Sequence, residues 1–140
     1  MRFLLDTNVI VYALNRKSAY NEEVLSFLFG CQAKNATCYF VSSSLKDAYY
    51  ILSKHYALEK DARAAIKCFR ECFDMVSLTD GIIDEAFESN EPDFEDAIVR
   101  VVAEALQVDA IVSYDVKAFA NSFMPKFTAR EAADRFLCDE

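Results

Sequence analysis

The chain has 140 residues, 54% of them hydrophobic, and a formal net charge of −8 at pH 7. This length fits one domain with a buried core, so we expect a single domain over residues 1–140, and the acidic balance disfavours binding of nucleic acid through a basic surface. No apolar run approaches the roughly 18 residues of a membrane span and no signal-peptide pattern opens the sequence, so we expect a cytoplasmic protein without a membrane segment.

The chain opens with a predicted buried strand over residues 2–5, followed by a helix over residues 9–14. The polar residues Asp6, Thr7 and Asn8 lie at the junction between them. In a parallel α/β sheet, ligands bind at the carboxyl ends of the strands, so Asp6 would face a site there. These residue types are also good helix N-caps, and capping is the simpler explanation of this junction taken alone.

Helices and short strands alternate along the rest of the chain. Apolar residues recur at helical spacing in the helices, and β-branched and aromatic residues are frequent in the strands. This alternation predicts an α/β fold with a mostly parallel central sheet flanked by helices in three layers. The expected helices cover residues 21–34, 42–56, 59–73 and 79–89, with further helices opening at 91–96 and at the capping box 128–131; the expected strands cover 37–41, 74–78 and 108–113, and the chain around residue 125 is expected to be a loop.

Further acidic residues lie near strand ends or helix starts. Asp47 falls in the expected first turn of a helix, where a carboxylate interacts favourably with the helix dipole. Asp93 and Asp96 are three residues apart, and they are therefore neighbours on one helical face. Asp115 follows the last expected strand, two residues after Ser113. Each of these acids, considered alone, is explained by capping or by the helix dipole.

Four of these acids, Asp6, Asp47, Asp96 and Asp115, would meet at one edge of a parallel sheet. Capping alone is an improbable reason for such convergence, because the carboxylates would raise one another's pKa values and weaken the fold. Ligation by oxygen atoms alone suits Mg²⁺ or Mn²⁺ better than zinc. Such ions activate water and clamp a phosphodiester for in-line displacement, and they locally reverse the negative charge that opposes nucleic-acid binding.

Four blocks of sequence resemble the PIN domain nucleases, and among them the VapC-type toxins of toxin–antitoxin pairs. Together they span most of the chain. The blocks are Leu-Leu-Asp-Thr-Asn-Val-Ile at residues 4–10, Ser-Ser-Leu-Lys-Asp at 43–47, Asp-Phe-Glu-Asp-Ala-Ile at 93–98, and Asp-Ala-Ile-Val-Ser-Tyr-Asp at 109–115 followed by Phe119. The family usually has Glu where Asp47 stands, and it often has Thr and a basic residue where Ser113 and Tyr114 stand.

The resemblance implies a function and a set of site residues. It implies a PIN-like domain that hydrolyses RNA with a water activated by Mg²⁺ or Mn²⁺, without a covalent nucleophile. It also implies a homodimer and a cognate antitoxin that blocks the acid site. The residues it assigns are Asp6, Asp47, Asp96 and Asp115 as catalytic and metal-binding acids, Asn8 and Ser113 as polar supports, and Asp93 as an auxiliary acid.

Other classes fit the sequence less well. Phosphate-transfer enzymes of the haloacid dehalogenase type also place Asp after the first strand, but they need a second Asp where Asn8 stands. A degenerate or housekeeping PIN domain that only binds RNA or protein is the more serious alternative, and its mark would be the loss of an acid. With two glycines, the chain contains neither a P-loop nor a dinucleotide fingerprint. The sole histidine, His55, is expected at the surface, and Cys68 and Cys72 are expected to be buried.

Overall fold

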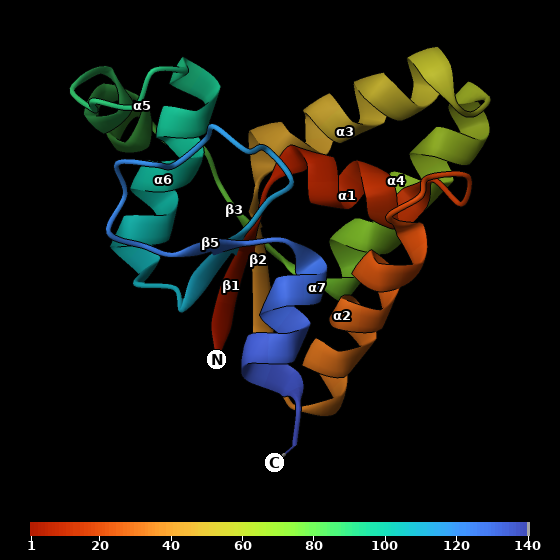
Figure 1. The fold of residues 1–140 in the computed structure, drawn as a ribbon. Coiled ribbons are helices and arrows are strands. Elements are labelled where there is room, and N and C mark those ends of the chain that lie inside the picture. Colours follow the sequence, from red (N-terminus) through yellow and green to blue (C-terminus); the bar gives the residue numbers. More distant parts are fainter. Residues whose placement is uncertain (140) are drawn as a thin grey trace.

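The computed structural model describes residues 1–139 as a three-layer α/β fold, in which helices cover both faces of a five-stranded sheet (Figure 1). All strand pairs are parallel, and the order across the sheet is β3-β2-β1-β4-β5. The predicted α/β fold with a parallel central sheet is therefore confirmed. The strands are β1 (Arg2–Leu5), β2 (Thr37–Val41), β3 (Asp74–Val76), β4 (Ala110–Val112) and β5 (Lys126–Phe127).

Helices fill the connections from β1 to β2, from β2 to β3 and from β3 to β4, whereas a loop joins β4 to β5 and a last helix follows β5. The predicted capping box is present before the last of them, because Thr128 Oγ1 accepts a hydrogen bond from Glu131 N and the Glu131 side chain accepts one from Thr128 N. Within residues 1–139, no helix is long and apolar enough to cross a membrane. The helices are α1 (Thr7–Leu14), α2 (Asn21–Ala33), α3 (Ser42–His55), α4 (Glu59–Cys72), α5 (Asp80–Phe87), α6 (Phe94–Leu106) and α7 (Ala129–Ala132), which continues as a π-helical turn (Ala133–Leu137).

Strand β1 is the centre of the sheet and is buried on both faces. Phe3 and Leu5 belong to a core shared with α1, α2, α3, α4 and α7, whereas Leu4 belongs to a core shared with α5 and α6. All three side chains are 0% exposed. Successive side chains of a strand point to opposite faces, so a strand covered on both sides is a continuous apolar run. This explains the uninterrupted apolar sequence that precedes Asp6.

The pairing of β1 with β4 decides where the acidic residues emerge. Leu5 pairs with Val112, so the two strands end side by side. The chain therefore leaves β1 at Asp6 and leaves β4 at Ser113 on the same edge of the sheet. Helix α1 begins at once, because Asp6 is its N-cap and its side chain accepts a hydrogen bond from Thr7 N.

The structure corrects three expectations. Lys126–Phe127 forms a fifth strand beside β4 instead of a loop, since two residues are too few to show a strand pattern in sequence. Asp47 lies in the second turn of α3, because Val41 is the N-cap and the helix therefore begins five residues before Asp47. Cys68 and Cys72 are exposed, because α4 buries a different face against the core.

Candidate active site

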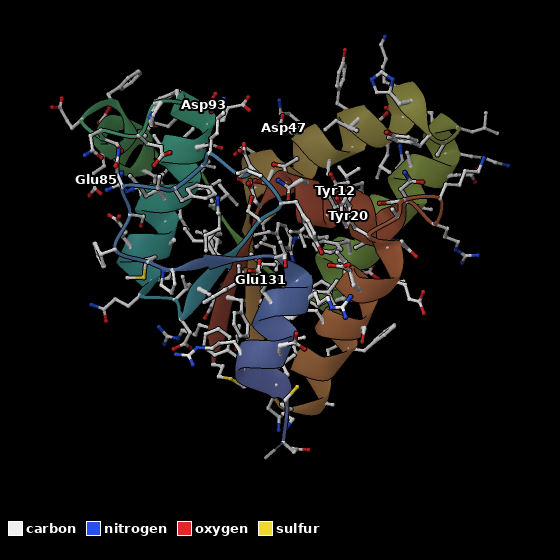
Figure 2. The ribbon with its side chains drawn as sticks, viewed as in Figure 1. Tyr12, Tyr20, Asp47, Glu85, Asp93 and Glu131 are labelled. Carbon is white, nitrogen blue, oxygen red and sulfur yellow. The ribbon has the colours of Figure 1, made fainter. Side chains whose placement is uncertain are left out.

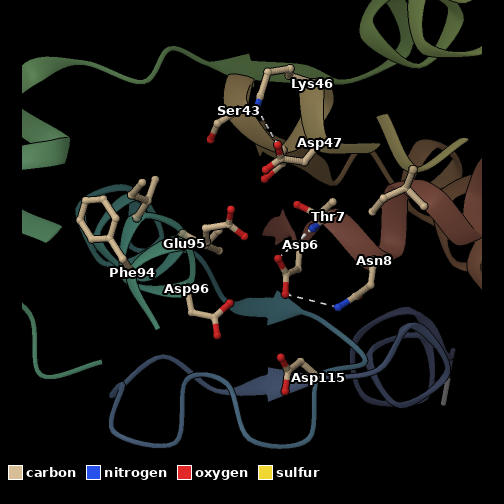
Figure 3. A pocket seen from close by; sticks show the side chains of 14 residues that line it. Asp6, Thr7, Asn8, Ser43, Lys46, Asp47, Phe94, Glu95, Asp96 and Asp115 are labelled. Atoms are coloured by element: carbon tan, nitrogen blue, oxygen red, sulfur yellow. Dashed lines mark hydrogen bonds and ion pairs between the residues drawn. The ribbon is translucent and has the colours of Figure 1, made fainter. Parts of the chain in front are cut away.

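A cleft of about 510 Å³ lies at the edge where β1 and β4 end (Figure 3). Its walls come from the β1–α1 junction, the first three turns of α3, the start of α6 and the loop after β4. The acidic residues that line it are Asp6, Asp47, Glu95, Asp96 and Asp115. The structure thus places all four predicted catalytic acids along one cleft, together with Asn8.

Asp6 is the buried acid at the floor of the cleft, with only 6% of its surface exposed. Its Oδ1 accepts a hydrogen bond from Thr7 N at 2.8 Å, and its Oδ2 accepts one from Ser113 Oγ at 2.8 Å. Burial raises the pKa of the Asp6 carboxyl, the bonds from Ser113 and Thr7 oppose that rise, and the charge of Asp115 adds to it. Asp6 is therefore a carboxylate that the fold holds in place at an electrostatic cost.

Asn8 and Ser113 tie the two strand ends together. Asn8 Nδ2 donates to Asp6 Oδ2 at 3.4 Å and to Ser113 Oγ at 3.3 Å, while Asn8 Oδ1 accepts from Tyr114 N at 3.1 Å. Ser113 Oγ also accepts from Asp115 N at 3.1 Å. Both side chains thus contact Asp6 or the backbone that carries Asp115, as supporting residues would.

Asp96 is a second acid of the cleft whose pKa is raised. Burial, together with the nearby charges of Asp6, Asp93, Asp115 and Glu91, raises the pKa of its carboxyl to about 7. Asp93 itself is the N-cap of α6, since its Oδ1 accepts a hydrogen bond from Asp96 N at 3.0 Å. Asp93 does not line the cleft, so its contact with Asp96 is the capping bond.

Asp115 lies on the loop that follows β4. Its Oδ1 accepts hydrogen bonds from Lys117 N at 3.0 Å and Ala118 N at 3.2 Å, and its charge raises the pKa values of Asp6 and Asp96. Lys126 of β5 donates from Nζ to the backbone carbonyl oxygen atoms of this loop. The short fifth strand thereby fixes the loop that presents Asp115.

Asp47 stands apart from the other three acids. Its Oδ1 forms an ion pair with Nζ of Lys46 at 2.9 Å, and its charge is not among those that raise the pKa of Asp6 or Asp96. Figure 3 shows Lys46 and Asp47 together on α3, across the cleft from Asp96. The structure therefore brings Asp6, Asp96 and Asp115 into electrostatic contact and leaves Asp47 paired with a lysine.

The chemistry of this donor set fits a hard divalent cation. Asp6, Asp96 and Asp115 offer carboxylate oxygen atoms, and their mutual repulsion is what a bound Mg²⁺ or Mn²⁺ would relieve. Within residues 1–139, however, no three acidic, histidine or cysteine side chains stand close enough together to hold one ion. Binding therefore requires the carboxylates to approach one another or to act through water, which magnesium retains readily.

Four residues at or behind the cleft were not predicted. Lys46, Phe94 and Glu95 line it, and Lys46 was recognisable as the cation next to Asp47 in sequence. Glu91 is buried behind the cleft, accepts a hydrogen bond from Phe119 N at 3.0 Å, and pairs with Arg100 at 3.4 Å. No local pattern indicates that contact, because it joins the segment before α6 to the loop after β4.

Tyr114 follows Ser113 in the loop after β4, but its side chain does not line the cleft. Its hydroxyl donates to Glu23 Oε2 at 2.7 Å, and its ring centroid lies 5.2 Å from that of Tyr12 and 4.6 Å from that of Tyr20. Figure 2 labels Tyr12 and Tyr20. Burial, together with the hydrogen bond to Glu23, raises the pKa of the Tyr114 hydroxyl. Tyr114 thus packs against α1 and α2 and supplies no charge to the cleft.

The sequence and the fold of the chain are each similar to those of known proteins. The sequence profile described as the PIN domain matches residues 2–117. No curated protein sequence matches the chain significantly. Among solved structures, VapC20 from Mycobacterium tuberculosis, described as a sarcin-ricin loop cleaving toxin, superposes with a TM-score of 0.66 at 16% identity, covering 81% of this chain and 89% of that chain.

Two further solved structures are of complexes. VapBC2 from Rickettsia felis, bound to a DNA fragment from its promoter, gives a TM-score of 0.67 at 20% identity, covering 91% of this chain and 98% of that chain. FitAB, bound to a DNA fragment, gives 0.65 at 16% identity, covering 91% and 95%. At these identities, the similarity to solved structures shows the shared fold.

Proposed function

Because this chain belongs to the PIN domain family, whose members are typically nucleases, we propose that it is a metal-dependent endoribonuclease. It hydrolyses phosphodiester bonds of RNA, and it acts in the cytoplasm as the toxin of a toxin–antitoxin pair. The observation that carries the proposal is that Asp6, Asp96 and Asp115 line one cleft, in which the charge of Asp115 raises the pKa of Asp6 and the charges of Asp6 and Asp115 raise the pKa of Asp96. Such an arrangement destabilises a protein unless a cation occupies it.

Asp6, Asp96 and Asp115 would hold Mg²⁺ or Mn²⁺ in this proposal, and Asp47 is the fourth acid of the site. When bound, the ion supplies an activated water and stabilises charge on the phosphodiester. Ser113 and Asn8 keep the Asp6 carboxylate in place through their hydrogen bonds to Oδ2.

Lys46 has a role that complements the acids. It is the one basic residue among the described residues that line the cleft, and its side chain is 76% exposed. A lysine ammonium is a compact positive charge suited to a phosphate oxygen. Lys46 would therefore exchange its contact with Asp47 for the phosphate of the bound RNA, leaving Asp47 free to face the metal directly or through water.

The proposal includes two protein partners. The solved complexes VapBC2 and FitAB have the same fold as this chain and support a cognate antitoxin that covers the acid cleft. A homodimer of this chain is the oligomeric state that we propose. Co-expression with the protein encoded beside it, followed by sedimentation of the complex, tests both partners together.

A second function is favoured by one observation. No three acids within residues 1–139 are close enough to hold one ion, and Asp47 is paired with Lys46. A degenerate or housekeeping PIN domain, which binds RNA or protein without cleaving RNA, would have these properties. The two functions differ in whether metal-dependent cleavage occurs.

Cleavage of a mixed RNA pool by the purified protein separates the two functions. We expect cleavage with Mg²⁺ or Mn²⁺, none with EDTA, and none in the Asp6→Asn and Asp96→Asn variants. Asp134→Asn, which alters an exposed acid far along the chain in the C-terminal π-helical turn, is the matched control and should cleave normally. Equal cleavage by wild type and Asp6→Asn, or none by the wild type with any divalent ion, would reject the nuclease and leave the binding module.

A further inference from the structure

Two phenylalanine rings are stacked and exposed at the rim of the acid cleft. Phe87 ends α5 and Phe94 begins α6, and their ring centroids lie 4.7 Å apart with 20° between the ring planes. Phe87 is 68% exposed and Phe94 is 41% exposed, yet Phe94 also lines the cleft beside Asp96 (Figure 3). Resting on the proposed ribonuclease function, we propose that this pair is a stacking site for one unpaired base next to the scissile phosphate.

The backbone fixes the position of the pair relative to the acids. Asp93 caps α6 through its bond to Asp96 N, which makes Phe94 the first residue of the helix and places Asp96 in the same first turn. A base stacked on Phe94 would therefore keep a constant position relative to Asp96. Aromatic rings that serve the core of this protein, such as the Phe3–Phe27 pair, are instead 0% exposed.

The charges around the pair favour a base over a phosphate. Glu85 and Glu88 lie within two residues of Phe87 in the chain and Asp93 directly precedes Phe94; Figure 2 shows Glu85 and Asp93 on the α5–α6 side of the molecule. These carboxylates repel an RNA backbone, whereas the face of a base is uncharged. Every base can stack on an aromatic ring, so the site would require an unpaired nucleotide without requiring a particular sequence.

The opposite wall of the cleft provides the place for the phosphate. Lys46 lies on α3 across from Phe94 (Figure 3), and its charge interacts with that of Glu95, which shares the first turn of α6 with Phe94. One nucleotide would thus bridge the cleft, with its phosphate toward Lys46 and its base on Phe94. This orientation restricts cleavage to single-stranded segments or loops, because a base in a duplex has no free face.

Fluorescence of 2-aminopurine tests the stacking site separately from cleavage. The probes are an eight-nucleotide RNA of mixed sequence and a stem-loop, each carrying 2-aminopurine at one position at a time. The buffer contains Ca²⁺ in place of Mg²⁺, so that a cation offsets the charge of the acids, and probes that remain uncut are the ones measured. We expect the wild type to quench the probe at one position, and an abasic nucleotide there to weaken binding roughly tenfold. In the cleavage assay with Mg²⁺, the cut would fall beside that same position.

Variants that keep or remove the aromatic face complete the test. Phe94→Leu and Phe87→Leu should lose the quenching, and their binding should become insensitive to the abasic nucleotide. Phe94→Tyr should retain both effects. The control is Phe29→Leu, which alters an exposed ring on α2 and should match the wild type. Circular dichroism confirms folding. Three results would overturn the stacking site. They are unchanged quenching in Phe94→Leu, absence of quenching by the wild type at every probe position, and variants that lose dimerisation while they keep their affinity for RNA. Quenching without cleavage would retain it and reject the nuclease.

Discussion

Ser113 Oγ donates a 2.8 Å hydrogen bond to Asp6 Oδ2, and this bond joins segments 107 residues apart in the chain. It exists because β1 and β4 are parallel neighbours that end at the same level of the sheet. Ser113 is buried, so its hydroxyl is shielded from water and its bond to a carboxylate is strengthened. The pair is the point where the fold fixes the acid site.

Ser113→Ala should weaken both the fold and the metal site. The bond from Ser113 opposes the rise in the pKa of Asp6 that burial causes, so removing it would raise that pKa further and favour the protonated, non-binding form. We expect a loss of about 1–3 kcal/mol in unfolding free energy and weaker Mg²⁺ binding. Urea unfolding and calorimetric titration measure the two effects, with Ser26→Ala, a change in an exposed serine of α2 that does not line the cleft, as the control. A variant that binds Mg²⁺ like the wild type would show that Ser113 does not tune Asp6.

Asp47→Asn should reduce RNA cleavage less than Asp6→Asn or Asp96→Asn does. Asp47 is paired with Lys46 at 2.9 Å and does not contribute to the raised pKa of Asp6 or Asp96. Loss of an outer ligand typically costs about tenfold to a hundredfold, so we expect about tenfold for Asp47→Asn and far more for the other two. Rates with saturating Mn²⁺ compare the three variants, each confirmed as folded. Equal losses would mean that Asp47 binds the ion directly.

The sequence indicates the acid edge of the sheet but not the contacts behind it. Asp6 and Asp115 could be placed because each follows an apolar run, and the ends of parallel strands share an edge. The sequence does not predict strand β5 or the buried contact of Glu91 with Phe119, because both depend on segments that meet only in the folded chain. The pairing of Lys46 with Asp47 depends on side-chain conformation, which residue spacing does not specify.

Glu91→Ala should destabilise the fold strongly. Glu91 bonds Phe119 N, and it pairs with Arg100, whose side chain is only 12% exposed and also contacts Glu104. Removing the Glu91 carboxylate leaves the buried Phe119 N–H without its acceptor, which typically costs about 1–3 kcal/mol, and leaves Arg100 with Glu104 as its remaining ion-pair partner. Thermal and urea unfolding would report the loss.

The matched control for Glu91→Ala is Glu59→Ala on α4. Glu59 pairs with Arg63 at 3.1 Å, but both side chains are well exposed, so solvent screens the interaction. We expect this variant to unfold almost like the wild type. A similar stability for the two variants would show that the network around Arg100 contributes no more than a surface ion pair.

The stability of the metal-free protein should fall as the pH rises from about 4 to 7. Burial and neighbouring acids raise the pKa of Asp96 to about 7 in the folded chain, whereas an unperturbed Asp titrates near 4. Between these values the folded chain binds more protons than the unfolded chain, and the linkage relation then gives a stability that decreases with pH. If Asp96 were fully buried, the unfolding free energy would fall by about 4 kcal/mol over this pH range. Asp96 is only half-buried, so solvent screens its charge and we expect a fall of roughly 1–2 kcal/mol.

Comparing the wild type with Asp96→Asn isolates the contribution of Asp96 to the pH dependence of stability from that of the other acids. The unfolding temperatures of both proteins are measured in EDTA at pH 4.5, 6 and 7.5. We expect the wild type to lose stability relative to the variant as the pH rises, because the amide that replaces the Asp96 carboxyl does not titrate. Mg²⁺ should restore the wild type most strongly at pH 7.5, where the carboxylates that would bind it are ionised, and should have little effect on Asp96→Asn. Parallel pH curves for the two proteins, with no response to Mg²⁺ in either, would contradict an acid cluster that is completed by a cation.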